Sequence, residues 1–183
     1  MSGRHTRLAN YALYQTGWFA CVLGAAWNRP WAGFLIAAIL VGVHLALSCD
    51  QLREVRLLLL ASVVGLAVEI VQIASGTYRF TSRTIVDALP PPWLVIMWAQ
   101  FATTFRFTLR PVIAAPFRAA LFGGAAGPIA FLAGERLGAV TLLSPRVHGL
   151  LRLSVVWAIV LFLFSLVLGR VLSTHTPHGY RTA

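Results

Sequence analysis

The sequence contains no lysine and only five acidic residues, although it carries fifteen arginines among 183 residues. Charged residues make up 11% of the chain, whereas a soluble domain carries about 25%. Hydrophobic residues make up 58%, and the mean hydropathy is +0.79. A chain so poor in charge cannot cover a water-facing surface of ordinary composition, which indicates an integral membrane protein.

Cysteine is also scarce, and the common catalytic motifs are missing. Cys21 and Cys49 form no C-x-x-C or zinc-ligand spacing, which excludes a disulfide framework. No G-x-S-x-G, Walker loop, G-x-G-x-x-G or H-E-x-x-H motif occurs, and His44 has no second ligand at metal-binding spacing. We therefore expect no metal and no cofactor, and a non-catalytic role is favoured over a membrane enzyme without a recognised motif.

Six apolar segments are each long enough to cross a bilayer, which takes roughly 20 residues. They lack the two-residue alternation of barrel strands, so they are predicted to be helices. The fold class is therefore an all-α membrane protein, with about six transmembrane helices in one compact bundle. The single domain covers residues 1–183, with a flexible tail over 174–183. The expected spans are residues 8–26, 31–49, 57–75, 92–109, 117–134 and 154–173.

The arginines set the expected orientation. If the N-terminus is cytoplasmic, nine arginines fall on the cytoplasmic side and six outside, as the positive-inside rule requires. Tryptophans near the outer ends, such as Trp27 and Trp93, agree with an interfacial belt. We expect a bacterial inner-membrane protein with both termini cytoplasmic. The net charge of +10 is expected to meet membrane lipids and not nucleic acid, because no polar basic patch is present.

Two connections are longer than simple turns. Residues 76–92 are polar and end in three prolines, which stiffen the entry to the next helix. Residues 135–153 mix leucines with Arg146, His148 and Arg152. This second connection is predicted to lie along the membrane interface as an amphipathic element.

Glu69 is the one acidic residue placed well inside an apolar segment. Steps of three and four residues place it on a stripe of small and polar residues: Ser62, Gly65, Glu69, Gln72 and Gly76. This stripe should face other helices. At about 1.5 Å per residue, Gln100 is the partner of best-matched depth, with Thr103 and Thr104 on the same face, while Arg106 is too far away. The expected internal polar site consists of Glu69, Gln72, Gln100, Thr103 and Thr104. It would either contact a ligand or relay protons, or it would only hold the helices together.

Two further groups have both a functional and a structural interpretation. Arg106, Arg110 and Arg118 are candidates to contact lipid headgroups or a partner protein, or they only set topology. Gly123 and Gly127 form a G-x-x-x-G motif before Pro128, which suits close helix packing more than dimerisation.

Three stretches carry a family resemblance: "YQTGWFACVLGAAWNRPWAG" (14–33), "FATTFRFTLR" (101–110) and "AGPIAFLAGERLGAVTL" (126–142). They resemble a bacterial inner-membrane family catalogued as domain of unknown function 2878, over most of the chain. Genes of that family often neighbour those of cyclopropane-fatty-acid-synthase-like methyltransferases and flavin-dependent oxidoreductases. The resemblance implies an accessory or lipid-holding subunit with a lipid-modifying enzyme as its partner. A small proton-coupled transporter that uses Glu69 is the alternative.

Overall fold

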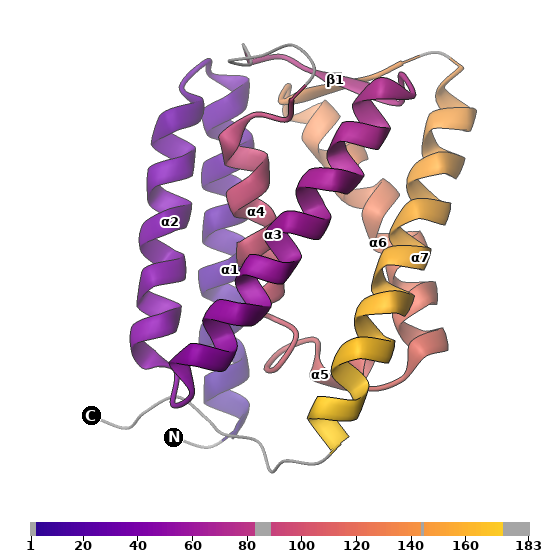
Figure 1. Ribbon diagram of the computed structural model, residues 1–183. Helices are drawn as coiled ribbons and strands as arrows, with labels where there is room; N and C mark the ends of the chain where they lie inside the picture. The colour runs from indigo at the N-terminus through magenta and orange to yellow at the C-terminus, as the bar shows by residue number, and fades with distance from the viewer. Residues whose placement is uncertain (1–2, 83–88, 144, 174–183) are drawn as a thin grey trace.

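The computed structural model describes residues 3–82, 89–143 and 145–173 (Figure 1). Seven helices and two short strands lie in this part of the chain. The expected tail over 174–183 lies outside the described residues. The elements are α1 (Gly3–Ala26), α2 (Pro30–Leu47), α3 (Gln51–Ala74), β1 (Tyr78–Phe80), α4 (Pro92–Ala102), α5 (Arg110–Ile113), α6 (Pro116–Arg136), β2 (Val140–Leu142) and α7 (Arg146–Ser173).

The helical fold class is confirmed, but six complete spans are not. Of the described helices, α2, α3, α6 and α7 are long and apolar enough to cross a membrane. Helix α1 has sufficient length at 24 residues, but Asn10 and Gln15 lower its hydropathy and it is not among these four. The structure is therefore consistent with a multi-pass membrane protein.

The expected span over 92–109 is wrong in its second half, because α4 ends at Ala102 and residues 103–109 form turns. The hydroxyls of Thr103 and Thr104 donate to the carbonyls of Gln100 and Phe101, each at 2.6 Å. The Asn10 amide on α1 donates to the Thr103 carbonyl at 3.1 Å. Side chains thus satisfy the backbone groups that a continued helix would have used.

Helix α4 lies at the centre of the first four helices. It packs against α1, α2 and α3, and none of its residues is exposed. Helix α6 packs along α7 as a separate pair, which stands beside α3 and α4 in Figure 1. We call these two parts the α1–α4 group and the α6–α7 pair.

A short antiparallel ribbon joins the two parts at one end, the upper end in Figure 1. Tyr78 pairs with Leu142 and Phe80 with Val140. The prediction of one amphipathic element over 135–153 is therefore wrong, because this stretch holds the end of α6, strand β2 and the start of α7. Gly138, at φ +89°, ends the turn after α6, the chain then enters β2, and α7 begins at residue 146.

Candidate functional site

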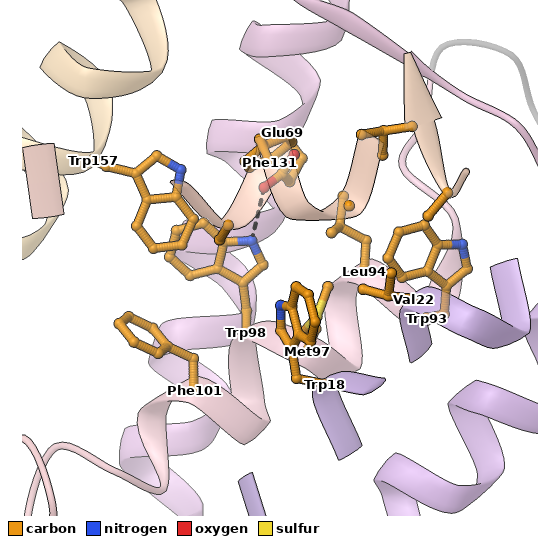
Figure 2. A pocket seen from close by; sticks show the side chains of 14 residues that line it. Trp18, Val22, Glu69, Trp93, Leu94, Met97, Trp98, Phe101, Phe131 and Trp157 are labelled. Atoms are coloured by element: carbon orange, nitrogen blue, oxygen red, sulfur yellow. Dashed lines mark hydrogen bonds between the residues drawn. The ribbon is translucent and has the colours of Figure 1, made fainter. Parts of the chain in front are cut away.

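Glu69 lies inside the molecule on α3, with 1% of its surface exposed. Its Oε1 accepts a hydrogen bond from Nε1 of Trp98 on α4 at 3.0 Å (Figure 2). Its Oε2 accepts a hydrogen bond from the Tyr78 hydroxyl on β1. Both partners are neutral donors, so the carboxyl group acts here as an acceptor.

The local sequence explains how Trp98 and Tyr78 reach this carboxyl group. Gly65 lies one turn before Glu69, and a Cβ there would be 2.1 Å from Cγ of Trp98, so only glycine leaves space for the indole. Gly76, at φ +66°, turns the chain after α3 and brings Tyr78 back over that helix. Burial, and then the neighbouring Glu69 carboxylate, raise the pKa of Tyr78 well above its ordinary value.

A partly open cavity of about 70 Å³ adjoins Glu69, between the α1–α4 group and the α6–α7 pair. One water needs only about 10–15 Å³ by the same measure. The walls are almost entirely apolar and aromatic (Figure 2). They are formed by Trp18, Val22, Glu69, Trp93, Leu94, Met97, Trp98, Phe101, Ala130, Phe131, Gly134, Ala139, Val140 and Trp157.

Stacked aromatic rings close the cavity toward α7. The rings of Trp98 and Trp157 lie 4.8 Å apart and nearly parallel, at 11°. Phe101 meets Trp157 edge to face at 5.7 Å. Because Trp98 also binds Glu69, the polar contact and the aromatic wall depend on the same side chain.

The other expected members of the internal polar site are buried but do not line this cavity. Gln100 does not pair with Glu69, contrary to the prediction, because its amide donates instead to the Leu13 carbonyl on α1 at 3.2 Å. Thr103 and Thr104 bond to the backbone of α4. Within the described part of the chain, Nε2 of Gln72 and Oε1 of Gln100 have no hydrogen-bond partner.

A second buried polar cluster lies near the other end of α3 and includes Glu54, which the sequence reasoning did not single out. Glu54 is 1% exposed. Its Oε1 accepts from Nη1 of Arg106 at 2.6 Å, and its Oε2 lies 3.2 Å from Nε2 of His44. Phe107 covers the His44 ring edge to face at 5.3 Å. His44 is thus one member of a three-residue network and not a lone packed histidine.

The three arginines expected to act together have different surroundings. Arg106 binds Glu54 and is partly buried. Arg110 is the first residue of α5, and Arg118 is exposed in the first turn of α6. A cavity brings Arg106 together with Arg53 and Arg56 of α3 instead.

The G-x-x-x-G motif packs inside the chain. A Cβ at Gly123 would be 2.4 Å from the carbonyl oxygen of Trp157, and one at Gly127 would be 2.4 Å from Cγ of Trp157. The two glycines therefore let α7 approach α6 closely. Among the described residues, no group of three or more His, Cys, Asp and Glu side chains is placed to hold a metal ion.

Comparison with protein families places the chain beside proteins of unknown function. A family model described as "Protein of unknown function (DUF2878)" matches residues 7–163. No curated protein and no solved structure matches the chain.

Proposed function

Because the chain belongs to the DUF2878 family of proteins of unknown function, we propose a function from its own site: it is a membrane protein that holds one end of an amphipathic lipid in the partly open cavity beside Glu69. The observation that carries this proposal is one buried carboxyl group set in an otherwise aromatic and aliphatic wall. Ligand sites commonly combine apolar walls with a few well-placed polar groups. The cavity has that composition.

The chemistry of Glu69 narrows the class of lipid. A carboxylate offers about four acceptor positions, and Trp98 and Tyr78 each use one. A hydroxyl or amine on the ligand would take another, while its hydrocarbon part would contact Trp18, Phe131 and the rest of the wall. An anionic group at this position would be repelled by the carboxylate.

The wider setting is also a proposal. The protein is placed in the bacterial inner membrane with both termini cytoplasmic. In support, α1 begins and α7 ends at the same end of the molecule (Figure 1). Among the described residues, more arginines lie at that end than at the other, namely Arg4, Arg7, Arg53, Arg56, Arg106, Arg110 and Arg118. We propose that the bound lipid is presented to a lipid-modifying enzyme, with this chain as a non-catalytic accessory subunit.

The experiment compares two alanine-to-leucine variants on α6. Ala130 lines the cavity, whereas Ala125 is exposed on the same helix. Chain purified in mild detergent is extracted, and the retained lipids are counted by mass spectrometry. Ala130→Leu should remove most of the retained lipid, and Ala125→Leu should retain it at the level of the unmodified chain.

Two results would overturn the proposal. One is equal lipid retention by Ala130→Leu and Ala125→Leu while both keep the thermal stability of the unmodified chain. The other is proton-coupled flux in vesicles that Glu69→Gln abolishes, because it would indicate a transporter instead.

A further inference from the structure

A second cavity, of about 240 Å³, lies at the opposite end of α3 from the Glu69 site. Its walls are Arg53, Arg56, Leu57, Leu60, Arg106 and Leu168. The four α3 residues follow a spacing of three, four and seven, so they lie on one face of the helix. Arg106 comes from the turns after α4, and Leu168 comes from α7. We call it the arginine cavity.

The charges around the arginine cavity are not balanced. Arg106 is paired with Glu54 at 2.6 Å, and Arg53 with Asp50 at 3.0 Å. Arg56 is exposed and has no carboxylate partner among the described residues. The three guanidinium groups outnumber the two carboxylates that pair with them. The net charge of these five side chains is therefore positive. The cavity also lies at the first turns of α3, where the helix dipole adds positive potential.

The cavity lining is half charged and half apolar. Leu57 and Leu168 are buried at 5% and 9% exposure, while Leu60 is 41% exposed. At about 1.5 Å per residue, Leu60 lies roughly 10 Å along α3 from Arg53. A ligand that fills the cavity would therefore meet both guanidinium groups and leucine side chains.

From this arrangement, we infer that the arginine cavity binds the phosphate of an anionic phospholipid, with the first part of an acyl chain against Leu57, Leu60 and Leu168. Guanidinium groups bind phosphate oxygens through charge-assisted, often bidentate hydrogen bonds. Arg56 supplies the charge that no carboxylate of the described chain neutralises. Arg53 and Arg106, already oriented by Asp50 and Glu54, supply further donors.

This inference does not depend on the proposed function. Arg56 and Glu69 lie 13 positions apart on α3, roughly 20 Å along the helix. The two sites also select opposite chemistry, since Glu69 accepts from a donor group and the arginine cavity attracts an anion. Ala130→Leu should therefore leave anionic-lipid binding unchanged, even if it empties the Glu69 cavity.

The test measures lipid binding to the full chain in mild detergent by native mass spectrometry. The probes are phosphatidylglycerol and phosphatidylcholine with identical acyl chains. The unmodified chain should bind phosphatidylglycerol more tightly. Arg56→Gln should weaken that binding about tenfold, as expected for loss of one charged hydrogen-bond donor, and Arg56→Lys should weaken it less.

Arg4→Gln is the matched control, because it removes one exposed arginine that does not line the cavity. It should change phosphatidylglycerol binding by less than about twofold. Equal losses in Arg56→Gln and Arg4→Gln would show attraction by net charge alone and would overturn the site. Unchanged binding in Arg56→Gln would do the same.

A competition experiment distinguishes a lipid from a soluble phosphate ester as the ligand of the arginine cavity. Glycerol 3-phosphate should not displace phosphatidylglycerol at equal concentration, because it makes no contact with the three leucines. If glycerol 3-phosphate binds as tightly as the lipid and loses affinity in Arg56→Gln, the cavity takes free phosphate esters and the lipid assignment is wrong.

Discussion

A carboxyl group inside an apolar wall is stable only where donors reach its oxygens. At Glu69 these donors are an indole and a phenol, both neutral and both attached to large apolar rings. The site therefore keeps one acceptor group in place without adding a second charge. A single fixed acceptor suits the binding of a lipid hydroxyl or amine better than it suits a proton relay, which needs several titrating groups in a row.

The depth of Glu69 was predictable from the sequence, but its partners were not identified. Glu69 and Trp98 are each six residues from the outer ends of their expected spans, about 9 Å at 1.5 Å per residue. Trp98 therefore matches Glu69 in depth more closely than Gln100, which lies eight residues from the same end, but the prediction allowed only amides and hydroxyls as partners. The contact between Tyr78 and Glu69 could not be predicted from depth, because it depends on how the chain folds back after Gly76.

At the residue scale, the buried Tyr78 phenol should make the stability of the folded protein depend on pH. Because its pKa is raised in the folded protein, the unfolded chain releases the phenolic proton first as the pH rises. Stability should be intact below pH 10 and should fall above it, by up to about 1.4 kcal/mol per pH unit. Thermal unfolding in detergent between pH 8 and 11 measures this slope.

Tyr78→Phe should start from a lower unfolding temperature, because Glu69 loses a donor, and should show a shallower alkaline decline. Tyr11→Phe is the control, since Tyr11 is 51% exposed. An alkaline decline in Tyr78→Phe as steep as that of the unmodified chain would contradict the prediction.

At the scale of elements, the α2–α3 hairpin and α4 show how far hydropathy and residue spacing predict the ends and contacts of helices. His44 and Glu54 each lie three residues from the ends of helices joined by a short turn. The expected spans began the third helix only at residue 57, which left Glu54 in the connection, so this pairing was not predicted. The early end of α4 was not predicted, because no glycine or proline between Trp93 and Leu109 marks the end of a helix. It depends on Asn10 and the two threonines replacing helical hydrogen bonds.

Two glycine-to-alanine changes, one at the contact between α3 and α4 and one away from it, should have opposite effects on stability. Gly65→Ala should push Trp98 off Glu69, since overpacking costs about 1–3 kcal/mol. Gly42→Ala on α2 meets no atom within 4 Å and should raise stability slightly through helix propensity. Unfolding temperatures in detergent measure both, and a Gly65→Ala chain as stable as Gly42→Ala would refute the close packing.

At the scale of the whole molecule, the α1–α4 group and the α6–α7 pair meet through a few defined contacts. They include the β1–β2 ribbon, the stack of Trp98 on Trp157, and the rings of Phe105 and Phe164, whose centroids lie 5.3 Å apart. The sequence predicted helices and their order, but it offered no sign of this division. Such a division arises from which faces pack, which hydropathy alone does not specify.

Trp157→Ala should loosen the α6–α7 pair more than the α1–α4 group, because it removes the stacked ring that joins them. Hydrogen–deuterium exchange in detergent should rise in α6 and α7 and change little in α1 and α2. Trp27→Ala, at a 69% exposed position, should leave both patterns unchanged. A uniform rise across all helices in Trp157→Ala would argue against two separate parts.

The burial of α4 has a consequence for how the protein tolerates different bilayers. A lipid-facing helix must match the hydrocarbon thickness by tilting or by deforming the membrane. Helix α4 has 11 residues, about 16 Å or half of a typical 30 Å hydrocarbon core, and no residue of it is exposed. It therefore carries no hydrophobic mismatch, and in a thinner or thicker membrane the outer helices can tilt while α4 keeps Trp98 in place.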